Sequence, residues 1–381
     1  MRPERSDGPA VIRTLLGSLG AIVAGLALGG LFLAARGKDV VAAFHLLLGR
    51  GFSPIGVSET LIAAAPLLLV GSGLVVALRA GAWNVGVDGQ LLVGALLAGV
   101  AGAALAPAVP PPVMWLLAAG AGAGGGLAWA LVPALLKVRW GLNEIITTLM
   151  MNYVAINATS WLVKGPAKDP SVVPPQTRLI PPDARLPDLF GSGVHVGFMA
   201  GVVAAVAVAL VFRSTVAGFR LDTLGRSRRV AVHAGMPVDR LVFGALLTSG
   251  AFAGLAGAND VLGVKGLFQG NWNPAYGFAG FALVALARLD GLWLVPFAWL
   301  LALLAVGGEL AARPLAIPSS FVGLLEGLIL LCFGIALAVE RRGIPWSRAP
   351  LPRPMTQPDT VPPTIEPDPE RNAVSSGIAR Q

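Results

Sequence analysis

The sequence predicts an all-α integral membrane protein with about ten transmembrane helices. Of its 381 residues, 55% are hydrophobic and only 13% are charged, and the mean hydropathy is +0.74. A soluble domain needs more polar side chains than this to cover its surface. Long apolar runs recur along the chain, and the arginines fall in the segments between them. The formal net charge of +8 therefore reflects membrane topology and not a nucleic-acid-binding face.

Each predicted span is a mostly apolar run that approaches the roughly 20 residues needed to cross the hydrocarbon core as a helix. The first run follows "MRPERSDGPAVIR", which lacks a small-residue cleavage site, so we expect the first helix to remain in the protein. The eighth run is the shortest. The predicted spans are 14–35, 60–78, 87–109, 113–136, 142–163, 194–212, 241–259, 276–288, 291–311 and 316–339.

The charges of the connecting segments predict the orientation of these spans. Segment 213–240 carries six arginines against two aspartates, whereas segment 164–193 has four basic and three acidic residues. Cytoplasmic loops of membrane proteins are enriched in Lys and Arg, so 213–240 is expected inside and 164–193 outside. We therefore predict a multi-pass membrane protein with both termini in the cytoplasm.

The composition divides the chain into parts. Residues 1–59 comprise a cytoplasmic stub, the first membrane helix and an interfacial helix in "VVAAFHLLLG". Residues 60–340 form the transmembrane domain, which contains the cytoplasmic loop 213–240. Residues 341–381 hold nine prolines between positions 345 and 369 and little to bury, which predicts a disordered cytoplasmic tail.

The start of the third span is interrupted by polar residues and glycines in "GAWNVGVDGQLLVGA". An unpaired backbone group in a bilayer costs several kcal/mol, so non-helical backbone persists there only when it is buried in protein or lines a watery cavity. We interpret this segment as a broken entry to a helix, in which Asn84 and Gln90 satisfy freed backbone groups. An ordinary cytoplasmic turn with Asn84 as helix N-cap is the alternative.

A second polar group lies in "WGLNEIITTLMMNYVA". Asn143 and Thr147 are separated by four residues, as are Thr148 and Asn152, which predicts a polar strip along the fifth span. Such a strip either hydrogen-bonds to neighbouring helices or lines a solute path, and the sequence leaves both open.

The third interruption lies in residues 265–291, where Pro274, Gly277 and Gly280 leave a helix too short to cross alone. A re-entrant or discontinuous element is expected. Trp-Asn pairs open both interruptions, at Trp83 and at Trp272, and the predicted topology gives the two segments opposite orientations. This pattern predicts discontinuous helices related by an inverted repeat around a solute site.

The cytoplasmic loop 213–240 contains "RRVAVHAG", which predicts a short helix ended by Gly235, with Pro237 preventing its continuation. A short helix on the cytoplasmic face is a docking element for another protein. A basic loop that contacts anionic lipid is the alternative.

Three of these segments together resemble a known family. "AGAWNVGVDGQLLVGA" is similar to the "F-N-I-G-x-E-G-Q" signature of bacterial ABC importer permeases of the nucleoside type, within the wider family of ribose and branched-chain amino-acid permeases. "GLNEIITTLMMNYVA" resembles the same family's "NE-x-I-x-T-x-M-x-N-Y" segment, and "GFRLDTLGRSRRVAVHAGM…ALLTSGAFAGLAGA" resembles its cytoplasmic coupling loop and following span. The resemblance covers residues 58 to 340.

The resemblance implies a transport subunit that works in membrane lipid with other proteins. The implied partners are a second permease subunit in a heterodimer, cytoplasmic ATPase subunits and an extracytoplasmic solute-binding lipoprotein, with no nucleic acid. The chain has no P-loop "GxxxxGK[ST]", so ATP is used by a partner, and no cofactor or metal is expected on this chain. The candidate solute-path residues are Trp83, Asn84, Asp88, Gln90, Asn143, Thr147 and Asn152. The candidate ATPase-coupling residues are Gly225, Arg226, Arg228, Arg229, Ala231, Ala234 and Gly235.

The sequence departs from the family pattern at three places. Trp83 stands where Phe is usual, and Asp88 stands where Glu is usual. Arg228 and Arg229 stand where an acidic or Asn-containing pair is common, which leaves the details of the ATPase contact open.

We therefore predict a permease for a nucleoside or similar neutral solute, because Trp83 and the amides supply stacking and hydrogen bonding without strong charge. A ribose-type sugar is the alternative solute. An ion-coupled secondary transporter is a further alternative and would need intramembrane acids, for which Asp88, Glu309 and Glu326 are the candidates. An intramembrane enzyme is disfavoured because the histidines at 45, 195 and 233 lie in unrelated loops.

Overall fold

The computed structural model describes residues 8–189, 191–312, 314 and 320–343. The start of the predicted N-terminal stub and the predicted tail from residue 344 onward lie outside the described residues, as does the side chain of Glu326. Two compact units divide the chain, Met1–Ala336 and Leu337–Gln381, and the following description concerns the first.

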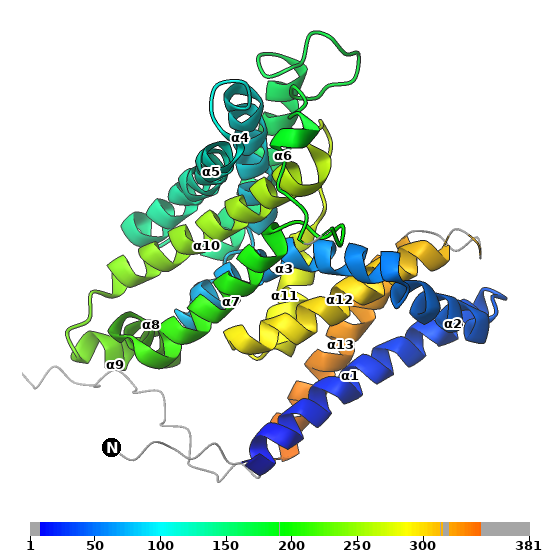
Figure 1. Cartoon of the computed structure of the whole chain (residues 1–381). Coiled ribbons are helices and arrows are strands. Elements are labelled where there is room, and N and C mark those ends of the chain that lie inside the picture. The colour runs from blue at the N-terminus through cyan, green and yellow to red at the C-terminus, as the bar shows by residue number, and fades with distance from the viewer. Residues whose placement is uncertain (1–7, 190, 313, 315–319, 344–381) are drawn as a thin grey trace, which may run out of the picture. The chain divides into compact units, whose positions relative to one another are not determined.

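The described part of the chain is helical, with only isolated β-bridges in its loops, as predicted for an all-α protein (Figure 1). The helices are α1 Gly8–Ala35, α2 Val40–Gly51, α3 Pro54–Arg79, α4 Val87–Leu105, α5 Pro111–Trp140, α6 Glu144–Lys164, α7 Gly197–Ser214, α8 Val216–Arg226, α9 Arg228–His233, α10 Val238–Asp260, α11 Tyr276–Leu286, α12 Gly291–Ala312 and α13 Ser320–Gly343. A 3₁₀ turn spans Pro182–Ala184, and a π-helical turn, Val261–Lys265, continues α10.

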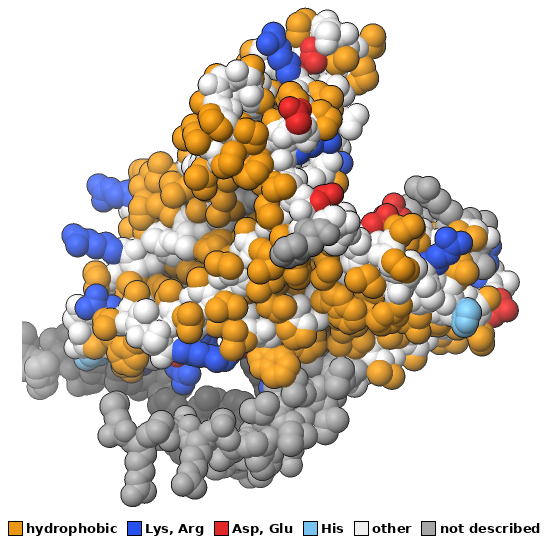
Figure 2. Space-filling view, viewed as in Figure 1, with side chains coloured by type: hydrophobic (Ala, Val, Ile, Leu, Met, Phe, Trp, Pro, Cys, Tyr) orange, Lys and Arg blue, Asp and Glu red, His pale blue; other side chains and the backbone are white. Residues whose placement is uncertain are grey.

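Six helices of the described part are long and apolar enough to cross a membrane: α3, α4, α5, α7, α10 with its π-turn, and α12. The protein is therefore a multi-pass membrane protein. Each of the other predicted spans contains a helix, but α6 is more polar and α11 is only 11 residues long, so the total of ten stays a prediction. Hydrophobic side chains cover much of the face shown in Figure 2, as expected for a surface in contact with lipid or with another membrane subunit.

The predicted helix boundaries depend on local capping. Asn143 is the N-cap of α6, where its side chain accepts a hydrogen bond from the backbone N–H of Ile145. Ser53 caps α3 in the same way, and Pro54 occupies the first helical position. Helix α5 ends at Gly141, whose φ of 67° lies in the left-handed region that favours glycine.

Helix α3 is central to the first unit. It contacts α7, α10, α11 and α12, and every residue from 64 to 77 is buried. Glu59 lies in the second turn of this helix, and Arg79 is its last residue. At about 1.5 Å per residue, these two side chains are separated by about 30 Å along the helix axis.

Helices α4, α5 and α10 pack side by side through glycines (Figure 1). A Cβ atom added at Gly126 of α5 would meet the Gly250 carbonyl oxygen, and one added at Gly254 of α10 would meet the Gly122 carbonyl oxygen. Small residues let backbones of membrane helices approach this closely. The packing of these three helices therefore depends on the absence of side chains at the contact.

Replacing Gly126 with leucine is expected to separate α5 from α10 and to lower the melting temperature of the detergent-solubilised protein, because overpacking costs about 1–3 kcal/mol or more. Gly124, on the same helix, is the matched control, since a Cβ there meets nothing within 4 Å. Thermal unfolding of Gly126→Leu and Gly124→Leu measures the difference. Equal melting temperatures for the two variants would contradict this account of the packing.

Candidate functional site

The first interruption lies between the end of α3 and the start of α4, and its core is a closed network of polar side chains. The Asn84 Nδ2 group donates to Gln90 Oε1 at 2.7 Å and to Ser249 Oγ at 2.9 Å. Asn84 Oδ1 accepts from the Gly86 backbone N–H at 3.2 Å and from Gln90 Nε2 at 3.0 Å. Asn84 is fully buried. The N-cap position of α4 is Gly86 and not Asn84, so the alternative in which Asn84 caps this helix is wrong.

Helix α6 supplies the other hydrogen bonds of the interruption. Asn152 Oδ1 accepts from the Gly89 N–H at 2.8 Å, and its Nδ2 donates to the Val85 carbonyl at 2.8 Å. The Val85 N–H donates to Thr148 Oγ1 at 3.2 Å. The two sequence blocks thus meet, and the amides satisfy backbone groups that would otherwise be unpaired in an apolar environment. Asn143 and Thr147 lie at the first turns of α6, where Thr147 donates to the Asn143 carbonyl.

The two interruptions are in direct contact. Asp88, in the first turn of α4, accepts a hydrogen bond through Oδ1 from the Gly277 N–H in the first turn of α11, at 2.7 Å. Trp83 stacks on Phe281 of α11, with ring centroids 6.2 Å apart and planes at 17°. Both helix N-termini carry partial positive charge, so a carboxylate between them is favourable. Asp88 therefore joins the two broken segments.

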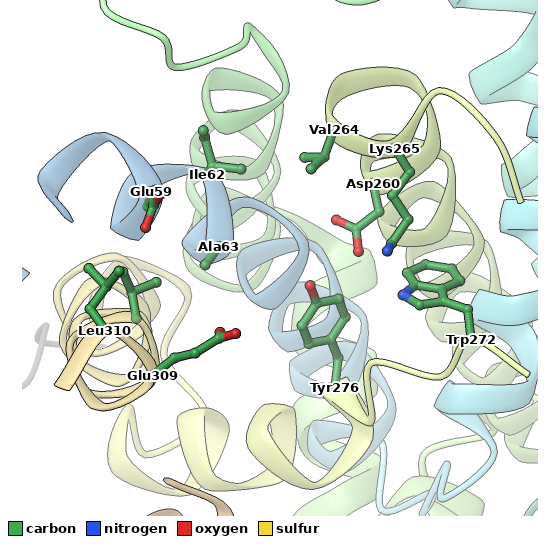
Figure 3. Close-up of a pocket in the computed structure, with 11 residues that line it drawn as sticks. Glu59, Ile62, Ala63, Asp260, Val264, Lys265, Trp272, Tyr276, Glu309 and Leu310 are labelled. Atoms are coloured by element: carbon green, nitrogen blue, oxygen red, sulfur yellow. The ribbon is translucent and has the colours of Figure 1, made fainter. Parts of the chain in front are cut away.

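A cavity of about 670 Å³ lies beside the N-terminus of α11 (Figure 3). Its walls come from α3, the end of α10 with its π-turn, the loop before α11, α11 itself and α12. The lining residues are Glu59, Ile62, Ala63, Asp260, Val264, Lys265, Trp272, Tyr276, Val306, Glu309 and Leu310.

None of the seven predicted solute-path residues is among those that line this cavity. The two regions are adjacent because Tyr276 lines the cavity and the next residue, Gly277, binds Asp88. Four of the lining residues were not predicted as site residues: Glu59, Asp260, Lys265 and Tyr276. Glu309 was predicted only as a candidate acid for ion coupling. The Trp-Asn-Pro-Ala-Tyr segment at 272–276 was the signal that pointed to this region.

The cavity wall combines aromatic rings with charged groups. The Tyr276 hydroxyl donates a hydrogen bond to the Asp260 carboxylate, and Figure 3 shows the two groups pointing toward each other. The Lys265 ammonium lies 5.0 Å from the Trp272 ring centroid, and Trp272 packs edge-on against Phe268 at 5.8 Å. Such a wall offers ring surfaces and hydrogen-bond acceptors to a small polar solute.

The backbone beside this cavity is strained. Asn271 has a φ of 64° and Ala275, the N-cap of α11, a φ of 55°, which L-residues rarely adopt. The π-turn that ends α10 is also an uncommon conformation that is frequent at functional sites. These features lie around the same cavity, which favours it as the functional region of the fold.

The predicted coupling residues make up a second candidate site on α8, α9 and the turn that follows. As predicted, "RRVAVH" is a helix, Arg228–His233, followed by Ala234 and by Gly235 with a φ of 68°. Ala231 is fully buried, whereas Val230 and Val232 are 55% and 56% exposed. Arg226 pairs with Asp222 at 2.9 Å, and Arg228 pairs with Asp239 at 3.4 Å. Arg229 is exposed.

This second site is connected to α3. Asp222 of α8 lies 3.6 Å from the Arg79 guanidinium at the end of α3. A Cβ at Gly225 would meet the Arg79 carbonyl oxygen, so α8 packs directly against the backbone there. The end of α3 opposite the cavity is thus held by the segment that carries α9.

Comparison with known proteins identifies the family of this chain. The chain matches the family described as "Branched-chain amino acid transport system / permease component" over residues 56–334. It is 33% identical to a glucose ABC transporter permease of Haloferax volcanii, over 84% of this chain and 90% of that protein. It is 34% identical to a guanosine ABC transporter permease of Bacillus subtilis, over 86% and 94%.

A nucleoside ABC transporter permease of Lactococcus lactis is 25% identical over 86% of this chain and 93% of that protein. These proteins are transport components and not enzymes. The long match and the multi-pass helical fold lead to one conclusion: the chain belongs to the branched-chain amino acid transport system permease family and is a permease component of an ABC transporter.

Proposed function

We propose that this permease carries a nucleoside across the bacterial plasma membrane and that the 670 Å³ cavity is part of the solute path. The observation that carries the proposal is the cavity itself, where the short helix α11 meets α3, α10 and α12 beside Trp272 and Tyr276. A nucleobase needs a ring to stack on and groups to hydrogen-bond with, and the cavity wall contains both. The guanosine permease of Bacillus subtilis supports the same solute class.

The cavity would face the extracytoplasmic side. The positive-inside rule puts Arg79 and the α8–α9 segment in the cytoplasm, and the cavity residues Glu59 and Glu309 lie at the opposite ends of their helices. Both termini are then cytoplasmic. In this orientation the cavity receives solute from an extracytoplasmic binding lipoprotein, and the exposed apolar faces of the bundle meet a second permease subunit.

The motion would be imposed by partner ATPase subunits that hydrolyse ATP and dock on α9, whose exposed Val230 and Val232 offer an apolar contact. Helix α9 follows α8 after the single extended residue Ser227, α8 packs on the end of α3, and α3 reaches the cavity about 30 Å away. A displacement of α9 can therefore reach the cavity through one buried helix. Transporters with a solute site of this kind generally work by rocking one half of the helix bundle against the other.

The predicted path residues have a place in this mechanism. Asn84, Gln90 and Asn152 hold the interruption before α4, and Asp88 ties it to α11. We propose that the solute passes this junction after it leaves the cavity, so that Trp83, which is 49% exposed, is the next ring it meets. Asn143 and Thr147 would lie near the cytoplasmic exit.

A sugar is the second candidate solute, because the glucose permease of Haloferax volcanii is about as similar as the guanosine permease. The test is ATP-driven uptake of labelled guanosine and labelled glucose by the complete transporter in proteoliposomes. We expect guanosine to accumulate and excess unlabelled glucose to leave that uptake unchanged. Accumulation of glucose without guanosine would replace the nucleoside with a sugar.

A further inference from the structure

The cavity that we propose as part of the solute path is lined by more acidic than basic side chains. Among its described lining residues, the acidic side chains are Glu59, Asp260 and Glu309, and the single basic side chain is Lys265. In Figure 3, Asp260, Lys265 and Trp272 lie on one side of the cavity, and Glu59 and Glu309 lie across from them. The Lys265 ammonium group is therefore on the wall opposite the carboxylates of Glu59 and Glu309.

We infer that Glu59 and Glu309 set the charge selectivity of the solute path, which admits neutral solutes rich in hydrogen-bond donors and rejects anions such as nucleotides and sugar phosphates. This inference rests on the proposed function, because it assumes that solute crosses the cavity.

Other acidic side chains in the described part of the chain form ion pairs, and this distinguishes them from Glu59 and Glu309. Glu144 is bound to Lys137 at 2.7 Å, and Asp290 is bound to Arg213 at 2.8 Å. Glu59 and Glu309 form no ion pair within the part of the chain that the structure describes. Both glutamates are exposed, so their charges act on the space of the cavity without a basic partner to neutralise them.

The chemistry of a carboxylate decides which solutes it favours. An ionised carboxylate is an acceptor only, so it binds hydroxyl and N–H groups of sugars and nucleobases. A phosphate or carboxylate on the solute is repelled by the two carboxylates, because a cleft lined by one sign of charge focuses the electric field. The two glutamates come from α3 and α12, so two different helices of the same wall carry this preference.

The local charge can be measured without any solute. In a Cys332→Ala background, Val306→Cys places a thiol in the cavity wall, and Val173→Cys places one in the outer loop at a position that is 91% exposed. Positively and negatively charged methanethiosulfonate reagents are applied to the complete transporter in proteoliposomes, and mass spectrometry of this chain gives both modification rates.

At each cysteine, the rate of modification by the cationic reagent is divided by the rate for the anionic reagent. We expect this ratio to be about tenfold higher at Val306→Cys than at Val173→Cys, because a charged cleft raises the local concentration of oppositely charged molecules by at least about this factor. Adding Glu59→Gln and Glu309→Gln should reduce that excess stepwise, because each removes charge with little change of shape. Equal ratios at the two positions, or an excess unchanged in the double variant, would overturn the inference. Melting temperatures identify a variant that misfolds, and the single glutamine variants then carry the test.

Uptake measurements separate this inference from the proposed function. If the wild-type transporter accumulates neither guanosine nor glucose, the proposed function fails whatever the thiol rates show. If it accumulates one of them while the thiol ratios show no excess, only the charge selectivity fails.

Discussion

Replacing Asp88 with alanine is expected to abolish ATP-driven uptake while the chain still assembles in the membrane. Asp88 is buried, and its carboxylate holds the first turn of α11 through the Gly277 N–H at 2.7 Å. Removing the acceptor leaves that N–H without its partner, at a cost of about 1–3 kcal/mol. The cost falls on the N-terminus of α11, which is part of the cavity wall. Initial rates of uptake by the complete transporter in proteoliposomes measure the effect.

Two variants make this test specific. Asp88→Asn keeps an oxygen acceptor and is expected to retain a measurable part of the uptake. Asp169→Ala is the matched control, because Asp169 also accepts from a nearby N–H, that of Ser171 at 2.9 Å, but is partly exposed in the loop after α6. The hydrogen bonds from Ser171 lower the pKa of Asp169, so its carboxylate is ionised at neutral pH. Wild-type uptake by Asp88→Ala, or equal losses in the two alanine variants, would show that transport does not depend on the link that Asp88 makes between the two broken segments.

The second large effect is expected at the end of α9. Gly235→Pro, or Arg228→Glu together with Arg229→Glu, should leave ATP hydrolysis by the complex measurable while uptake falls at least about tenfold. Proline fixes φ near −65°, whereas Gly235 has a φ of 68°, so the chain after α9 must change direction. ATPase activity and uptake are measured on the same proteoliposomes, and their ratio reports the coupling.

Gly235→Asn is the matched control, because asparagine tolerates the left-handed region better than other L-residues. A Cβ at position 235 meets no atom within 4 Å, so only the backbone angle is tested. Full uptake by Gly235→Pro would remove α9 from the coupling mechanism. Loss of ATP hydrolysis and uptake together would instead indicate a failure of assembly.

The helices and the interruptions could be predicted from sequence because their signals are local. Apolar runs gave the positions of α3, α4 and α12, and the glycine and amide residues of "NVGVDGQ" marked a break that needs hydrogen-bond partners. Asn84, Gln90 and Asn152 do lie together, as motif blocks that satisfy one another's backbone groups. Their assignment to the solute path stays a prediction.

The cavity could not be predicted, since its wall is assembled from residues as distant as Glu59 and Glu309. Which face a membrane helix turns inward depends on its packing. For α3 the apolar pattern carries no such information, because all residues from 64 to 77 are buried. Likewise, Asn143 was assigned to a continuous polar strip, but its side chain caps α6. A capping role and a lining role use the same residue type, and only the helix start separates them.

The most direct test of this account is the dependence of uptake on a separate ATPase. Proteoliposomes that contain this permease with all of its partners are compared with vesicles from which only the ATPase subunits are omitted, each with ATP and with an inward Na⁺ or proton gradient. We predict accumulation of guanosine in the first vesicles and none in the second under either gradient. Accumulation driven by an ion gradient in vesicles without the ATPase would show that the protein is an ion-coupled transporter. That result would contradict a mechanism in which the ATPase subunits move the solute path through α9.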